Sequence, residues 1–133
     1  MNDYRTNRPR TDILEELRQQ GRFSDFFLLA WGIIEWRANE CILKAHDLSS
    51  QDPKSKPLLK LSVGSKLKKL KDLGVLPVAA YEIVNQFKMK RNDLVHRDAL
   101  FILGLSEPEK EEIYDMGMHA ADAMHELIRV AVR

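Results

Sequence analysis

Residues 24–47 read SDFFLLAWGIIEWRANECILKAHD, and this stretch decides the fold class. Placed on a helical wheel at about 100° per residue, it is apolar around most of its circumference. A helix of this kind has to be covered by other helices, so we predict the central helix of a bundle. Its predicted core face consists of Trp31, Ile34, Ala38, Cys41 and Ile42.

The length and composition predict one globular domain. The chain has 133 residues, 44% of them hydrophobic and 31% charged, with six glycines and five prolines. This balance is typical of a folded helical protein. We predict a single domain over residues 1–133, with residues 1–10 as a flexible arm. Cys41 has no second cysteine to pair with, and no segment has the about 18 consecutive apolar residues of a membrane span. We therefore expect a cytoplasmic protein that does not enter the membrane.

The segments on either side of residues 24–47 are predicted to be a short helix and a loop. Thr11 and Asp12 cap an apolar-periodic run that ends near Gly21. Residues 49–57 are polar and rich in proline, which favours a connecting loop.

Three further helices are predicted in the second half of the chain. Residues 65–73 form a basic helix closed by Gly74, and residues 78–101 form a long helix. Ser106 and Glu109 have the spacing of a capping box, which begins a last helix that runs to the C-terminus. Strand patterns and internal repeats are missing from the sequence. We predict an all-α fold, an up-and-down bundle of four to five helices.

Residues 90–97 read KRNDLVHR and put a charged residue on an apolar stripe. Arg91 follows Phe87 by four residues and precedes Leu94 by three, so it falls inside the stripe. Its guanidinium must either extend to solvent or bind an acidic or phosphate partner beside the apolar surface. The stripe consists of Ala80, Ile83, Val84, Phe87, Leu94 and Val95.

The same segment carries a candidate catalytic set, Arg91, Asn92 and His96. Asn92 and His96 are four residues apart and adjacent on the helix, while the long Arg91 side chain can reach a ligand lying across it. An imidazole exchanges protons near neutral pH, and a guanidinium pairs with phosphoryl oxygens. These groups suit phosphodiester cleavage without a metal: Arg91 holds the phosphate, and His96 exchanges a proton with a 2′-hydroxyl or the leaving oxygen. Attack by a 2′-hydroxyl requires RNA.

Charge is unevenly distributed along the chain. Residues 53–97 contain eleven Lys and Arg against three acids, a net +8, whereas residues 98–133 have a net charge of −5. A basic segment favours contact with an RNA backbone. The alternative is that the lysines at 66, 68, 69 and 71 solvate an amphipathic helix. The predicted RNA-binding cations are Lys66, Lys69, Lys88, Lys90 and Arg97.

Glu35 is a supporting candidate, because it projects from the apolar helix where an unpaired carboxylate is costly. Arg91 is one candidate partner. In the alternative, Glu35 reaches solvent or pairs with a surface lysine.

We expect no metal or other cofactor. His119 and His125 are six residues apart, about 120° around their helix, and no further ligand completes a zinc set. Cys41 is expected to be a core residue and not a nucleophile, since a reactive thiolate needs an electropositive and partly exposed setting.

The arrangement of Arg91, Asn92, three residues and then His96, late in a long helix, resembles the HEPN superfamily. A preceding short helix with the sequence LKKLKDLGVL at residues 67–76 adds to the likeness, which spans residues 24–131. The resemblance implies a helical bundle that dimerises so that two copies of the motif face one cleft.

The resemblance also implies a function. Many members of the superfamily are metal-independent endoribonucleases, often toxins paired with an antitoxin protein or anti-phage effectors, that leave a cyclic phosphate. Carried over to this chain, Arg91 and His96 take the catalytic positions and Asn92 orients the histidine or the phosphate. Other members bind RNA, a nucleotide or a protein partner without cleaving, and this alternative stays open.

Overall fold

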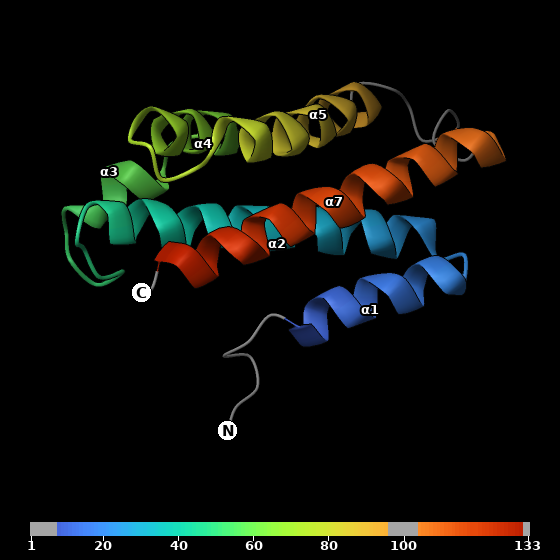
Figure 1. The fold of residues 1–133 in the computed structure, drawn as a ribbon, viewed down its shortest axis with the longest axis horizontal. Helices are drawn as coiled ribbons and strands as arrows, with labels where there is room; N and C mark the ends of the chain where they lie inside the picture. The colour runs from blue at the N-terminus through green and yellow to red at the C-terminus, as the bar shows by residue number, and fades with distance from the viewer. Residues whose placement is uncertain (1–7, 96–103, 132–133) are drawn as a thin grey trace.

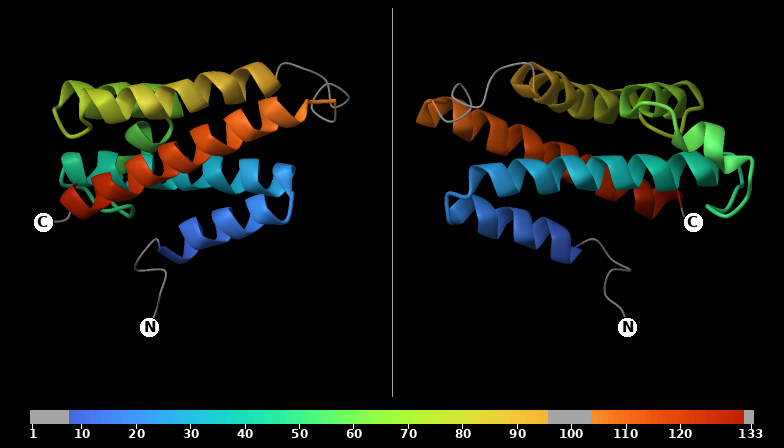
Figure 2. Two further views of the ribbon diagram at one scale, coloured as in Figure 1. Left: turned by 45° about the vertical axis from the view of Figure 1, so that its right-hand side comes forward. Right: turned by 180° about the vertical axis from the view of Figure 1, so that it is seen from behind.

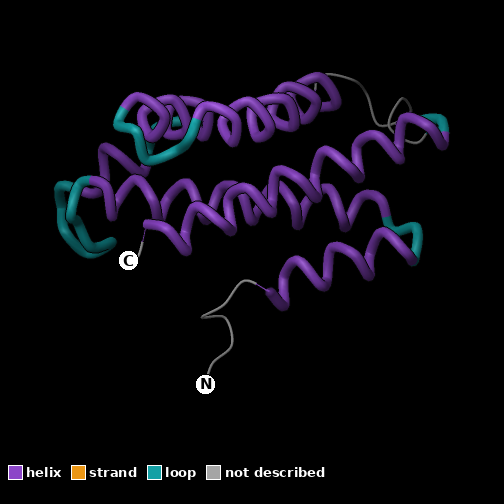
Figure 3. The backbone as a smooth tube through the Cα atoms, viewed as in Figure 1, coloured by secondary structure: helices purple, strands orange, loops and turns teal. Residues whose placement is uncertain are grey.

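The computed structural model describes the backbone of residues 8–95 and 104–131, with side chains over 12–94 and 104–126. Within these ranges every regular element is a helix, as Figure 3 shows, which confirms the predicted all-α fold. No helix in these ranges is both long and apolar enough to cross a bilayer. The helices are α1 (Arg8–Gln19), α2 (Phe23–Ala45), α3 (Ser55–Leu59), α4 (Val63–Asp72), α5 (Val78–Val95) and α7 (Glu107–Ala131).

The long helices alternate in direction, as predicted for an up-and-down bundle (Figure 1). Helix α7 packs against both α2 and α5, and α1 packs against α2 and α7. The connection between α2 and α5 contains α3 and α4, which lie at one end of the bundle (Figures 1 and 2). Helix α4 packs on both α2 and α5, so it joins these two helices at that end.

Several helix ends follow the predicted local signals. Gly74 has a φ of +78°, the left-handed conformation that glycine adopts at little cost, and its amide donates to the Lys71 carbonyl at 3.0 Å. The capping box is present: the Glu109 amide donates to Ser106 Oγ and the Ser106 amide donates to Glu109 Oε1, both at 3.3 Å.

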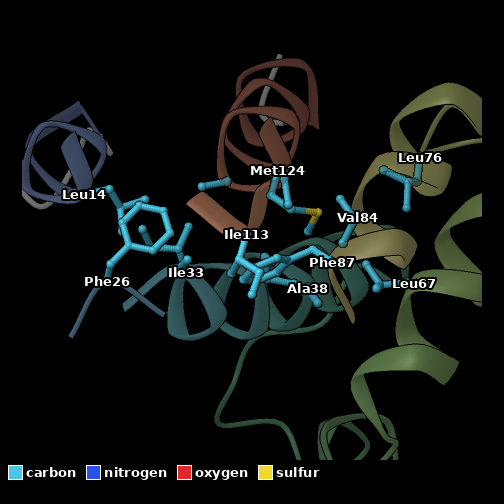
Figure 4. Packing of buried hydrophobic residues seen from close by; sticks show 14 of the residues in the cluster. Leu14, Phe26, Ile33, Ala38, Leu67, Leu76, Val84, Phe87, Ile113 and Met124 are labelled. Carbon is cyan, nitrogen blue, oxygen red and sulfur yellow. The ribbon is translucent and has the colours of Figure 1, made fainter. Parts of the chain in front are cut away.

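The core lies between α2, α5 and α7, with contributions from α1 and α4 (Figure 4). On the predicted face of α2, Ile34, Ala38, Cys41 and Ile42 are buried, while Trp31 is half-buried. The predicted stripe of α5 is correct for its centre, where Val84, Phe87 and Leu94 are buried. It is wrong at Ile83, which is 39% exposed because it lies at the edge of the stripe.

Some predicted boundaries are corrected by the structure. Helix α1 begins at Arg8, inside the predicted arm, and α4 begins at Val63, two residues before its predicted start. The predicted loop 49–57 overlaps α3, which is held by Ser55: its buried Oγ donates to the Asp52 carbonyl at 2.7 Å. Residues 96–101 of the predicted fourth helix lie outside the described residues.

The core position of Cys41 leads to a testable pH dependence. Burial raises the pKa of its thiol from 9.0 to about 12. Between these values the unfolded thiol has lost its proton and the folded one retains it, so stability falls as the pH rises. We expect this group alone to cost about 1.4 kcal/mol at pH 10. Urea titrations at pH 8 and pH 10 measure it.

The control for this effect is Cys41→Ala. The loss of stability between pH 8 and pH 10 should be smaller in this variant by the same amount, whatever other groups titrate. An equal loss in both proteins would show that the thiol is not shielded by the core.

Candidate functional site

Arg91 borders a cavity of about 270 Å³ formed where α2, α4 and α5 meet. Helix α2 provides an aromatic wall and a carboxylate, the first turn of α4 provides small residues, and α5 provides two cations and an amide. The residues lining it are Trp31, Glu35, Ser62, Val63, Gly64, Lys88, Arg91 and Asn92.

Trp31 explains how Arg91 is accommodated on an apolar stripe. The guanidinium carbon lies 4.9 Å from the centre of the Trp31 ring, a cation–π contact that keeps the charge beside an aromatic surface. The Trp31 ring in turn lies 6.5 Å from Phe87 in the core. Arg91 Nη1 donates to Asn92 Oδ1 at 3.4 Å, so the two residues of the predicted motif are in contact. The guanidinium has further N–H groups with which to meet a ligand.

Lys88 brings a second positive charge to the same cavity. It precedes Arg91 by one helical turn and is half-buried. Its Nζ lies 3.0 Å from where a Cβ on Gly64 would stand, so the lysine crosses the first turn of α4 at a point where a larger residue would displace it. The positive end of the α4 dipole is therefore close to two cationic side chains. This arrangement favours an anion in the cavity.

Glu35 lines the cavity, and the ion pairs among the described residues do not include one between Glu35 and Arg91. Its side chain is exposed, which fits the alternative that it reaches solvent. The carboxylate also acts on Lys66, whose pKa it raises in opposition to the effect of burial. Glu35 is thus an exposed acid beside two cations.

Lys66, predicted to be an RNA-binding cation on α4, is buried in the structure. Its side chain is 5% exposed, and its Nζ donates to Asn39 Oδ1 at 2.6 Å and to the Leu59 carbonyl at 2.9 Å. Burial lowers its pKa, with the Glu35 carboxylate as a smaller opposing influence. Because Lys66 falls on the buried side of α4 with Leu70, it joins α4 to α2 and is not available to a ligand.

The other predicted cations do not gather at one place. Lys69 is exposed on α4 away from the cavity, and Lys90 faces α7, with its Nζ 3.9 Å from Glu112. His96 and Arg97 lie outside the described residues. Of the predicted catalytic and RNA-binding residues, the structure brings together Arg91, Asn92 and Lys88.

Two residues of this cavity, and a third residue elsewhere on α2, were not predicted from the sequence. Ser62 and Gly64 line the cavity, although their distance along the chain from α5 gave no sign of it. Arg37 is fully buried, with its Nη1 2.6 Å from Glu40 and its guanidinium 4.1 Å from the Trp36 ring. The sequence did contain a signal for the burial of Arg37: it follows Ile34 by three residues, which places it near Ile34 on the buried side of α2.

In the part of the chain that the structure describes, no three histidines, cysteines or acids are grouped in a way that could hold a metal. The chemistry available at the cavity is that of two cations, an amide and a carboxylate.

Comparisons with family models, curated proteins and solved structures give no significant match to this chain. The likeness to the HEPN superfamily therefore depends on Arg91, Asn92 and His96 and on the order of the helices around them.

Proposed function

We propose that the cavity beside Arg91 binds a phosphate of RNA and that the protein is a metal-independent endoribonuclease. One observation carries the proposal: the Arg91 guanidinium lies over Trp31 at a cavity that it shares with Lys88 and Asn92. A planar guanidinium held in place offers paired N–H donors to phosphoryl oxygens, and Lys88 adds a second charge. His96 follows Arg91 by five residues in the sequence.

In the proposed reaction the 2′-hydroxyl of a ribose attacks the adjacent phosphorus and the 5′-oxygen leaves. Arg91 and Lys88 stabilise the charge that grows on the non-bridging oxygens. His96 exchanges a proton with the 2′-hydroxyl or with the leaving oxygen. The products are a 2′,3′-cyclic phosphate and a 5′-hydroxyl. In line with the resemblance, we propose a homodimer that acts as a toxin or defence effector with a cognate antitoxin.

The proposal is tested by incubating the purified protein with RNA in EDTA. The wild type should cut, and Arg91→Ala and His96→Ala should each lower kcat/KM by about 10²–10⁴-fold. The matched control is Lys44→Ala, which removes an exposed lysine of α2 that does not line the cavity. It should stay within about threefold of the wild type. Cleavage that stops in EDTA, or that survives in Arg91→Ala, would contradict the proposal.

A second candidate function is RNA binding without cleavage. Arg91 and Lys88 at one cavity are sufficient to hold a phosphate, whatever His96 does. In that case the wild type binds RNA in a salt-dependent way and releases no cyclic phosphate. Arg91→Ala would then weaken binding, while His96→Ala would leave it unchanged.

A further inference from the structure

The cavity contains a carboxylate for which phosphate binding alone gives no reason. Glu35 follows Trp31 by one turn of α2, and the ring of Trp31 carries the Arg91 guanidinium. A carboxylate repels an anionic ligand and so weakens its binding. A role for the carboxylate in the reaction would compensate for this cost. This role must suit an exposed carboxylate that lines the same cavity as Arg91 and Lys88.

The size of the cavity limits how far Glu35 can lie from a phosphate bound there. A volume of about 270 Å³ corresponds to a sphere about 8 Å across, close to the lower limit for sites that hold small ligands. In RNA the attacking 2′-oxygen lies about 3–3.5 Å from the phosphorus in a reactive conformation. A phosphate held by Arg91 and Lys88 in this cavity therefore brings its neighbouring 2′-hydroxyl within reach of the other lining residues.

We propose that Glu35 is the general base of the ribonuclease reaction, an inference that rests on the function proposed above. A Glu35 carboxylate oxygen takes the proton of the 2′-hydroxyl as the bond between the 2′-oxygen and phosphorus forms. The bond between phosphorus and the 5′-oxygen breaks, and the 5′-oxygen takes a proton from the His96 imidazolium. Glu35 ends protonated and His96 neutral, and exchange with water restores both.

This assignment gives each group the role that suits its ordinary chemistry. Near neutral pH a carboxylate is normally deprotonated and an imidazole is partly protonated, so the first is ready to accept a proton and the second to donate one. His96 is thereby assigned to the leaving oxygen.

A structural role for Glu35 has to be distinguished from a catalytic one, because its charge also acts on Lys66. The discriminating substrate is an oligoribonucleotide that the wild type cuts, with the 5′-oxygen of the cut linkage replaced by sulfur. A thiolate leaves without being protonated, so the substitution removes the need for a general acid and leaves the need for a base.

On the ordinary oligoribonucleotide, Glu35→Gln should lower kcat/KM by about 10²–10⁴-fold. It should also lose the rise of kcat/KM with pH on the acidic side of the profile, and Glu35→Asp should regain part of the rate. On the sulfur substrate, His96→Ala should recover at least about tenfold, whereas Glu35→Gln should recover nothing. Glu82→Gln, an exposed acid on α5 outside the cavity, should match the wild type on both substrates.

The outcomes separate this inference from the proposed function. If the wild type cuts no RNA, the ribonuclease function fails and the role of Glu35 fails with it. If the wild type cuts and Glu35→Gln cuts within about threefold of it, or if the sulfur substrate rescues Glu35→Gln, the function stands and Glu35 is not the base. Thermal melts of all variants show whether a loss of rate comes from unfolding.

Discussion

Replacing Phe87 by alanine should lower the free energy of unfolding by about 3–5 kcal/mol, the usual cost of removing a buried phenylalanine. The Phe87 side chain is fully buried, and its ring lies 5.5 Å from Phe27 in an edge-to-face contact and 6.5 Å from Trp31. It extends from α5 into the space between α2 and α7 (Figure 4). The cavity left by the substitution is enclosed by helices on three sides, so it can collapse only in part.

Urea denaturation followed by circular dichroism measures this change. The matched control is Met89→Ala on the same helix, because Met89 is 60% exposed and its truncation should alter stability by less than about 0.5 kcal/mol. A loss of under about 1 kcal/mol in Phe87→Ala would show that α5 does not pack on α2 and α7 in this way.

The position of Phe87 also connects the stability of the fold with the site. One face of α5 is buried through Val84 and Phe87, and Arg91 lies on this face one turn after Phe87. Lys88 lies beside the same face and reaches the same cavity. Phe87 packs against Trp31, which in turn faces the Arg91 guanidinium. The geometry of the phosphate-binding groups therefore depends on core packing directly beneath them.

The all-α fold was predictable because its signals are local. The apolar circumference of residues 24–47, the capping box at Ser106 and the glycine at position 74 each act through neighbouring residues. Helix α3 was missed because its stability is not local: Ser55 is buried by tertiary packing, and its hydrogen bonds are made to carbonyls of the preceding loop.

The candidate site was predictable only in part. Periodicity places Arg91 on an apolar stripe. The ring that makes the cation–π contact with it belongs to Trp31, sixty residues earlier in the sequence. Lys66 shows the opposite error, since a lysine predicted to be a surface cation is buried and donates to Asn39 Oδ1 and the Leu59 carbonyl. Spacing identifies which side of a helix a residue occupies, and the partner across the interface comes from the fold.

At Gly117, α7 lies close against its neighbours, and Gly117→Leu should destabilise the protein by about 3 kcal/mol. A Cβ at this position would lie 2.7 Å from Phe26 Cε1 and 3.2 Å from Phe87 Cε1. Both rings are fully buried and have no free space into which to move. Leucine forms helix better than glycine by close to 1 kcal/mol, so the expected loss has to exceed that gain.

Gly32→Leu makes the same chemical change in α2 and is expected to have the opposite sign. Gly32 is exposed, and a Cβ there would meet no atom within 4 Å. The variant should gain about 0.5–1 kcal/mol from helix propensity alone. Urea denaturation gives the difference in the free energy of unfolding between the two variants. Because both variants gain the same helix propensity, this difference measures the cost of forcing α7 away from Phe26 and Phe87. Equal stabilities in the two variants would mean that α7 does not approach α2 and α5 as closely as these rings require.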